Sequence, residues 1–450
     1  MFQKVLVANR GEIAVRIIRS LRELGIETVA VYSTVDEDAL HVHLADEAVC
    51  IGEAPAKRSY LHMENIIQAA INTGSEAIHP GFGFLSENAK FAELCESCNI
   101  VFIGPSSKVI NDMGDKAKAK ALMKKAGVPL VPGSDGEITV EEGLDLTKEI
   151  GLPVLIKASA GGGGRGMRVV RRLEEFEAQY YAARQEAAAA FSSDGVYLEK
   201  LVENPRHIEV QILADKYNNT LHLFERDCSV QRRNQKVIEE APSIIDGTLK
   251  HAMYDAAIKA AKAVNYENAG TVEFIVANNA FYFIEMNTRI QVEHPVSEMI
   301  TDIDIIAEQI RIASGFHLPY TQESIKSKGH AIEVRINAEN PVKNFMPSPG
   351  RVSFLHFPQG PGIRFDSMLY QDYTVSPHYD SMVGKLIVHA NDRPAAIRKM
   401  RSALEELITE GITTNQWFLW MIMNHEDYVE GSFDTSFIVK NIKKLIRYEN

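Results

Sequence analysis

The segment from Tyr282 to Pro295, Y-F-I-E-M-N-T-R-I-Q-V-E-H-P, carries a polar side chain at every second position over half its length. The alternating residues are two acids, two amides and a cation: Glu285, Asn287, Arg289, Gln291 and Glu293. Alternate side chains of an extended chain point to the same face. The segment therefore predicts a strand that continues into extended chain. One face would carry the acidic, amide and cationic side chains, and the other would pack its apolar side chains in the protein interior.

A second strand is predicted just upstream, at Thr271 to Val276. The short A-N-N-A turn between the two strands predicts a hairpin that brings Glu273 beside Glu285. Two carboxylates and an amide oxygen suit Mg²⁺, which proteins hold with few carboxylates plus substrate phosphates, and Arg289 offers a planar donor pair for a small oxyanion. The alternative is the solvated outer face of an antiparallel sheet, which also alternates. We favour a metal–phosphate centre.

The first part of the chain alternates short apolar strands with amphipathic helices. The expected strands are Val5–Ala8, Thr28–Tyr32, Ala48–Ile51, Ala77–His79 and Val101–Ile103. The expected helices carry Ile13, Ile17, Leu21 and Leu24, span about Met63–Ala70, and pass through Phe91 and Leu94. This alternation predicts a mostly parallel sheet covered by helices, a Rossmann-like unit. The first turn, A-N-R-G-E, lacks G-x-G-x-x-G, so we assign no dinucleotide to it.

A second unit is predicted to begin near Gly114, with a helix at Asp115–Ala126. Two strands, Val154–Ala158 and Met167–Val170, flank a glycine-rich loop that includes Gly161 to Gly164. Such a loop exposes backbone N–H groups to phosphate oxygens. It is not a Walker A motif, because G-K-[ST] is missing. A flexible hairpin tip is the alternative; we interpret the loop as a mobile lid over a nucleotide.

The rest of the chain predicts a mixture of strands and helices. The expected helices are Glu174–Phe191, Tyr254–Val264, Ile305–Ala313 and Arg393–Glu410, and the expected strands are Val196–Val202, His207–Leu213, Leu221–Glu225, Arg351–Phe357 and Val383–His389. The cation-rich segment Arg226–Lys236 fits either a solvated edge or a binding site for an anionic substrate. From Gly329 onward the pattern indicates a smaller α+β domain in which Glu333 and Arg335 share a face.

Composition excludes several classes of function. The net charge of −12 and the pI near 5.7 argue against a general binder of nucleic acid or acidic membranes. The four cysteines do not form a disulfide framework, and we expect Cys95 and Cys98 to be reduced helix residues. No apolar run reaches the length of a membrane span, and the N-terminal one is too short for a signal peptide. We expect a cytoplasmic protein.

Seven motifs in order along nearly the whole chain carry a resemblance to a known family. They are V-A-N-R-G-E-I-A, H-P-G-F-G-F-L-S-E-N, K-A-S-A-G-G-G-G-R-G-M, E-R-D-C-S-V-Q-R-R, E-M-N-T-R-I-Q-V-E-H-P, R-I-N-A-E and Y-D-S-M. Together they resemble the biotin carboxylase family of the ATP-grasp superfamily, which includes the subunit that serves bacterial acetyl-CoA carboxylase.

The resemblance implies three domains and a reaction. The domains are a Rossmann-like unit at 1–113, an ATP-grasp domain at 114–327 with a lid at about 132–203, and a smaller α+β domain at 328–450, commonly in a homodimer. ATP, bicarbonate and biotin on a biotin carboxyl carrier protein would give ADP, phosphate and carboxybiotin. This is the first half-reaction of acetyl-CoA carboxylase, and carboxyltransferase subunits then make malonyl-CoA for fatty acid synthesis. The chain lacks M-K-M, the usual biotin-attachment signature, so biotin is expected on another protein.

The resemblance also implies roles for individual residues. Those matching ATP contacts are Lys116, Lys157, Gly161, Gly162, Gly163, Gly164, Glu199, Lys200, Val202, His207 and Gln231. Those matching Mg²⁺ (or Mn²⁺) ligands are Glu273, Glu285 and Asn287. Those matching the bicarbonate pocket are Lys236, Arg289, Gln291 and Val292, the last through its backbone N–H. Glu293 matches the general base, and Arg335 the group that faces the biotin ureido oxygen.

Three positions depart from the family pattern. Asn234 stands where many members have His, Ala160 where some have Gly, and Phe82 where Tyr is common. The departures put fine contacts to nucleotide or biotin in doubt and leave the expected reaction intact. Two other functions stay open: a different ligase that forms carboxyphosphate, such as one making carbamoyl phosphate, and a catalytically idle paralogue that binds a carrier. The second would be supported by loss of Glu293, Arg335 or a metal ligand, and all are present.

Overall fold

The N-terminal unit is a five-stranded parallel sheet covered by helices, in the computed structural model that describes residues 1–159, 167–191 and 194–447. The strand order is β3-β2-β1-β4-β5, and Val5, Leu6 and Val7 of the central strand are fully buried, as expected for parallel strands covered on both faces. Its elements are β1 Lys4–Val7, α1 Gly11–Glu23, β2 Glu27–Ser33, α2 Leu40–Leu44, β3 Glu47–Gly52, α3 Met63–Thr73, β4 Ala77–His79, α4 Ala89–Ser97, β5 Val101–Phe102 and α5 Ser107–Gly114. The predicted parallel sheet is confirmed. Cys95 and Cys98 are both free, as expected; Cys95 lies buried in α4, whereas Cys98 is the C-cap residue just after this helix.

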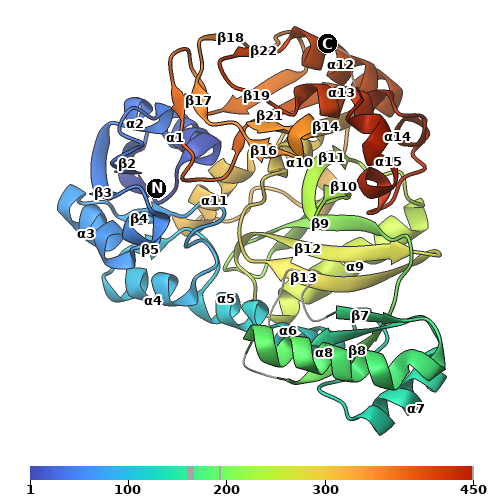
Figure 1. The fold of residues 1–450 in the computed structure, drawn as a ribbon. Helices are drawn as coiled ribbons and strands as arrows, with labels where there is room; N and C mark the ends of the chain where they lie inside the picture. The colour runs from blue at the N-terminus through green and yellow to red at the C-terminus, as the bar shows by residue number, and fades with distance from the viewer. Residues whose placement is uncertain (160–166, 192–193, 448–450) are drawn as a thin grey trace.

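A small antiparallel sheet, β7-β6-β8, forms a separate layer at the bottom of Figure 1. Helix α8 packs on it through Phe176, Tyr180 and Ala183, which contact the buried side chains of the strands. The elements of this part of the chain are α6 Lys116–Lys125, α7 Val140–Ile150, β6 Val154–Ala158, β7 Met167–Val170, α8 Phe176–Phe191 and β8 Val196–Lys200. Strands β6 and β7 have the predicted bounds. The glycines between them, and Ala160, lie outside the described residues.

An eight-stranded sheet runs through the middle of the molecule in the order β13-β12-β9-β10-β11-β14-β21-β19 (Figure 1). Its first five strands belong to the central part of the chain and its last three to the C-terminal part. The strands are β9 Arg206–Ala214, β10 Thr220–Arg232, β11 Gln235–Ala241, β12 Asn268–Ala277, β13 Ala280–Asn287, β14 His330–Asn337, β19 Ile363–Ser367 and β21 Met382–Ala390. Helix α9, Gly247–Ala263, packs alanines against β9 and β12. Helices α10, His294–Thr301, and α11, Ile305–Ala313, follow β13.

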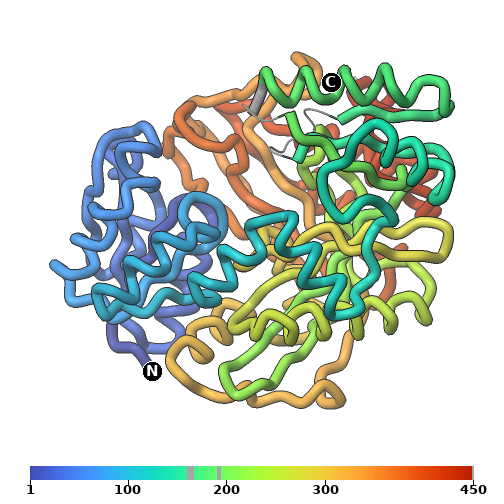
Figure 2. The backbone as a smooth tube through the Cα atoms, turned by 90° about the horizontal axis from the view of Figure 1, so that it is seen from below, coloured from blue at the N-terminus to red at the C-terminus, as the bar shows by residue number. Residues whose placement is uncertain are grey.

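The C-terminal part adds helices and short strands around its share of the sheet. They are β15 Glu339–Asn340, β16 Met346–Pro347, β17 Gly350–Arg351, β18 Phe354–His356, β20 Thr374–Val375, α12 Arg393–Glu406, β22 Ile408–Glu410, α13 Gln416–Asn424, α14 Glu426–Glu430 and α15 Phe437–Leu445. The tube in Figure 2 shows this part beside both the N-terminal unit and the central sheet. Among the described residues, no helix is long and apolar enough to cross a membrane.

Several predicted elements have other bounds in the structure. The strand predicted at Val196–Val202 ends at Lys200, and the one predicted at Arg351–Phe357 is two short strands, β17 and β18. The helix predicted for Arg393–Glu410 stops at Glu406, because Leu407 is extended and the next three residues pair with β18. Strand β13 stops at Asn287, and the chain from there to α10 is a loop. The cation-rich segment predicted at 226–236 is the end of β10 and the start of β11.

Candidate active site

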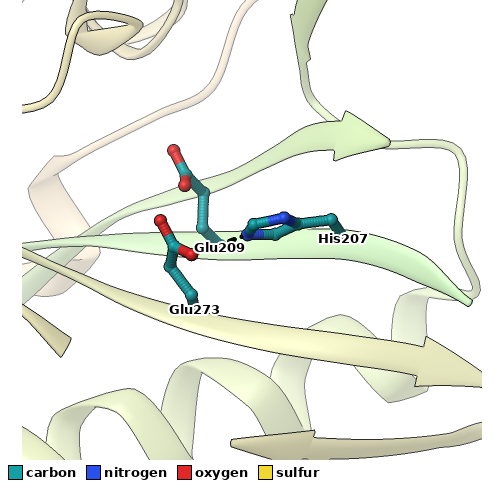
Figure 3. A group of neighbouring side chains, drawn as sticks. All are labelled: His207, Glu209 and Glu273. Atoms are coloured by element: carbon teal, nitrogen blue, oxygen red, sulfur yellow. Dashed lines mark ion pairs between the residues drawn. The ribbon is translucent and has the colours of Figure 1, made fainter. Parts of the chain in front are cut away.

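The hairpin predicted from the sequence exists and places two carboxylates side by side. Strands β12 and β13 pair with Glu273 opposite Glu285 and Thr271 opposite Asn287. On the other side of β12, strand β9 places Glu209 opposite Glu273 and His207 opposite Ile275. Figure 3 shows the Glu209 and Glu273 carboxylates on the same side of these two strands, with the His207 ring paired to Glu273.

Lys236 from β11 joins three carboxylates that come from different elements. Its Nζ lies 2.5 Å from Glu209 Oε2, 2.9 Å from Glu273 Oε1 and 2.6 Å from Glu293 Oε1. Burial alone would lower the pKa of Lys236, but the three anions raise it well above its usual value. The lysine therefore stays charged and fixes the relative positions of β9, β12 and the loop before α10.

Glu273 is the most heavily hydrogen-bonded carboxylate of the site. Besides Lys236, it accepts hydrogen bonds from Asn287 Nδ2 at 2.8 Å and Gln291 Nε2 at 3.0 Å, and it pairs with His207 Nε2 at 2.9 Å. Burial would raise the pKa of Glu273, but Lys236 and His207 hold it well below its usual range. Glu273 is therefore an anion at neutral pH.

Glu285 has the opposite electrostatic environment. Burial raises its pKa, and the negative charge of Glu273 across the hairpin raises it further, whereas Lys116 lowers it. A divalent cation bound between two neighbouring carboxylates favours the ionised form of both and so offsets their mutual repulsion. Asn287 adds an amide oxygen on the same hairpin. This oxygen donor set fits the predicted Mg²⁺ site.

The loop between β13 and α10 holds the other predicted anion-binding groups. Arg289 donates from Nε to Glu87 at 2.9 Å, from Nη1 to Gln291 Oε1 at 2.6 Å and from Nη2 to Asn287 Oδ1 at 3.3 Å. At the end of the loop, Glu293 is fully buried. Side chains from both the N-terminal unit and the hairpin thus hold the Arg289 guanidinium in place.

Glu293 lies between two cations. One oxygen binds Lys236, and the other accepts from Arg335 Nη2 at 3.0 Å. Burial opposes ionisation, but Lys236, Arg335 and Arg226 lower the pKa of Glu293 well below its usual value. Held in this way Glu293 is a weak base, because a general base works best with a pKa near the working pH.

Arg335 is shared between Glu293 and Glu239. Arg335 Nε donates to Glu239 Oε1 at 2.7 Å. Burial raises the pKa of Glu239 to about 7, with Arg335 opposing that shift and Glu293 adding to it. The guanidinium is therefore oriented from β11 and β14 at once.

These groups surround a cavity of about 1070 Å³ between the three parts of the chain. Its lining includes the following predicted site residues: His207, Gln231, Lys236, Glu273, Glu285, Asn287, Arg289, Gln291, Val292 and Arg335. Phe82 and Asn234, two departures from the family pattern, also line it. Glu293 lies behind the wall, in contact with two residues that do line the cavity.

A second group of predicted residues lies on the small sheet. Lys157 and Lys120 both pair with Glu199, and Lys200 Nζ donates to the carbonyl oxygens of Gly151 and Leu152. The following predicted residues are not among the described ones that line the cavity: Lys116, Lys157, Glu199, Lys200 and Val202. Gly161 to Gly164 lie outside the described residues. The described nucleotide contacts that were predicted thus lie on two sheets, except for Lys116, which begins α6, and Val202, which follows β8.

Among the polar residues of the site that were missed in the sequence are four that hold the predicted ones in place. Glu209 and Glu239 hold Lys236 and Arg335, Glu87 holds Arg289, and Arg226 is fully buried with its Nε 2.5 Å from Glu209. The alternation of His207, Glu209 and Gln211 with apolar residues was a visible signal for Glu209. Arg226 itself fits neither interpretation of the cation-rich segment, because it is buried and is not on the cavity wall, whereas Lys236 at the end of the segment does line the cavity.

Comparisons with known proteins agree with this geometry. Residues 1–110 match the family description "Biotin carboxylase, N-terminal domain", residues 115–321 "Carbamoyl-phosphate synthase L chain, ATP binding domain", and residues 333–440 "Biotin carboxylase C-terminal domain". A biotin carboxylase of Nostoc sp. is 57% identical over 440 residues, which cover 97% of this chain and 98% of the relative. This chain belongs to the biotin carboxylase family.

Two further biotin carboxylases support the assignment. Biotin carboxylase 1 of Bacillus subtilis is 57% identical over 442 residues, covering 97% of this chain and 98% of the relative. The biotin carboxylase domain dimer of the Hydrogenobacter thermophilus 2-oxoglutarate carboxylase, solved with MgADP, ADP and bicarbonate, is 51% identical with a TM-score of 0.92 and covers 100% of both chains. The chain is therefore an ATP-dependent ligase with the biotin carboxylase fold. The exact domain boundaries and the residue roles stay predictions.

Proposed function

We propose that this biotin carboxylase uses ATP and bicarbonate to carboxylate biotin on a separate biotin carboxyl carrier protein. In the same proposal it acts in the cytoplasm as a homodimer, and its product passes to carboxyltransferase subunits of an acetyl-CoA carboxylase. The observation that carries the proposal is the position of the Lys236 ammonium. It forms ion pairs both with Glu273, on the β12–β13 hairpin that would hold the metal, and with Glu293, which also pairs with Arg335. A phosphoryl-transfer centre and a proton-transfer centre thus share one cation.

The nucleotide would lie between the hairpin and the small sheet. Lys116, Lys157, His207 and Gln231 would contact its phosphates and ribose, and Glu199, Lys200 and Val202 its adenine side. Glu273, Glu285 and Asn287 would hold Mg²⁺ or Mn²⁺. When bound, the ion would offset the negative charge that phosphoryl transfer concentrates on the oxygens.

Bicarbonate would bind Lys236, Arg289, Gln291 and the backbone N–H of Val292. An anion there competes with Glu293 for the Lys236 ammonium, and loss of that partner raises the pKa of Glu293 toward a useful range. Glu293 then removes the bicarbonate proton, and the bicarbonate oxygen attacks the γ-phosphorus of ATP. The products of this step are carboxyphosphate and ADP.

The second step forms carboxybiotin. Carboxyphosphate breaks down to CO₂ and phosphate, and the phosphate removes the proton from N1 of biotin. Arg335, oriented by Glu239, stabilises the negative charge on the ureido oxygen. The N1 electron pair then attacks CO₂ and forms the N–C bond, so no covalent intermediate with the protein is required.

The test is ADP release with Mg-ATP, with bicarbonate and free biotin added separately and together. We expect a strong rise only when both are present. A rise with bicarbonate that is indifferent to biotin would instead indicate another ligase that forms carboxyphosphate. ATP binding without any ADP release would indicate an idle, carrier-binding paralogue.

A further inference from the structure

The carbonyl oxygen of Val292 cannot be satisfied by the helix that follows it. Val292 lies one residue before Glu293, the N-cap of α10, and the carbonyl of the N-cap residue is the first one that N–H groups of the helix satisfy. Position 295 is a proline with no N–H, and the N–H of Val296 donates to Glu293 O. A buried carbonyl in this position needs a donor from elsewhere.

Lys385 from β21 supplies that donor. Its Nζ lies 2.5 Å from Val292 O, and its side chain is fully buried. Strand β21 pairs with β14 so that Lys385 lies opposite Arg335. The lysine therefore approaches the loop from the sheet that also carries Arg335.

The same ammonium is 3.4 Å from Glu12 Oε1 in the first turn of α1. Glu12 is buried, and neither of its carboxylate oxygens has a hydrogen bond. One buried cation thus contacts all three parts of the chain: the N-terminal unit, the loop before α10 and the C-terminal strands. Burial of such a charge is costly unless its partners are well placed.

The geometry points to Lys385 as a positioning residue for the bicarbonate pocket. The carbonyl of Val292 and the N–H of Glu293 belong to one planar peptide unit. Fixing the carbonyl oxygen therefore orients the peptide plane that leads into Glu293 and restricts where the Glu293 side chain can lie. Lys385 touches no reacting atom; it holds the peptide that carries the proposed base. This inference rests on the proposed use of bicarbonate at that loop.

Lys385→Met tests it by removing both the donor and the charge. We expect kcat/KM for bicarbonate to fall by about 100-fold, the size of effect that a small misplacement of a reacting group produces. Nucleotide binding, measured by calorimetry, should change by less than about threefold, because the predicted nucleotide contacts lie on other strands. Equal losses in both quantities would overturn the inference and leave Lys385 a purely structural role.

The double variant Lys385→Met with Glu12→Gln separates positioning from charge balance. It removes the buried cation and its anion together, so it also serves if the single variant does not fold. We expect the loss in kcat/KM to persist, since Val292 O still lacks a donor. Recovery to within a few-fold of wild type would show that Lys385 only neutralises Glu12 and would overturn the inference.

Lys250→Met is the matched control. Lys250 also donates to a backbone carbonyl, Ser243 O at 2.7 Å, and pairs with a buried acid, Glu225, at 2.9 Å. It should lose stability but keep kcat/KM for bicarbonate within about twofold.

The wild-type protein is assayed first, so that failure of this inference can be told apart from failure of the proposed function. If wild-type ADP release depends on bicarbonate but not on biotin, biotin is not the acceptor, and the comparison of Lys385→Met with wild type still tests the role of Lys385. If wild type uses no bicarbonate, both proposals fail.

Discussion

At the scale of single residues, the site is a cluster in which positive and negative side chains alternate. Lys236 contacts Glu209, Glu273 and Glu293, and Glu293 in turn contacts Arg335. The cations hold the pKa values of Glu273 and Glu293 well below their usual range, and the carboxylates in turn raise the pKa of Lys236 although it is buried. In the proposed function, a substrate anion that enters this cluster would displace one of the carboxylates, so that binding of the anion and activation of the base would be the same event.

The first prediction concerns Glu293→Gln. The amide is nearly isosteric but cannot remove a proton, so we expect bicarbonate-dependent ADP release to fall by about 10²- to 10⁴-fold while ATP binding is retained. Steady-state rates and calorimetry measure the two quantities. Glu308→Gln, at a mostly buried glutamate on α11 that lies beside Arg311 and outside the cavity lining, should leave both unchanged. Full turnover in Glu293→Gln would refute the base assignment.

The second prediction concerns pH and Glu239. Burial raises its pKa from 4.5 to about 7, within a cluster that includes Arg335, Glu293 and Lys236, with Glu333 opposite on β14. Between these two values the folded protein holds a proton that the unfolded chain releases. This contribution to stability is complete below pH 4.5 and is lost as pH rises through about 7.

Glu239→Gln keeps an oxygen that accepts from Arg335 but cannot titrate. Its unfolding temperature, measured by scanning calorimetry, should therefore fall less between pH 5 and pH 8 than that of wild type. Identical slopes for the two proteins would contradict the raised pKa.

At the scale of elements, the hairpin was readable from the sequence because period-two alternation and a short turn are local signals. The register of Glu273 with Glu285 followed from them. What is not local was missed: the end of β13 at Asn287, the pairing of Ile408–Glu410 with β18, and the burial of Arg226 against Glu209. These depend on contacts between segments that are far apart, which alternation does not encode.

The third prediction concerns the hairpin as a metal-binding element. Removal of the Glu285 carboxylate by Glu285→Gln leaves the strand pairing intact but takes away one proposed ligand. We expect the Mg²⁺ concentration for half-maximal ADP release to rise by about 10- to 100-fold, and chelation of the metal to abolish release in wild type. Glu323→Gln, in the short 3₁₀ turn 322–324, serves as the control and should titrate like wild type. An unchanged metal requirement in Glu285→Gln would exclude Glu285 as a ligand.

At the scale of the whole molecule, the three-part division of the sequence is only partly a division of the structure. The N-terminal unit has its own sheet, as the strand–helix alternation predicted. The central and C-terminal parts share one sheet through the pairing of β11 with β14, from Ile238 opposite Val334 to Ala241 opposite Ala331. The change of pattern near Gly329 marked a change in the type of elements and did not reveal that the next strand joins the same sheet.

The small sheet β7-β6-β8 stands apart from this shared sheet, and Leu130 opposite Phe283 is the isolated bridge that links its segment to β13 among the described residues. Lys157 and Glu199 thus belong to one hydrogen-bonded sheet, and His207, Glu273 and Glu285 belong to another. A nucleotide bound as proposed would contact both sheets, but only the large sheet carries the proposed metal ligands Glu273 and Glu285. Substitutions of Lys157 or Glu199 would then alter nucleotide binding and release alone, whereas substitutions of Glu273 or Glu285 would also alter how fast the nucleotide reacts, a difference that transient kinetics resolves.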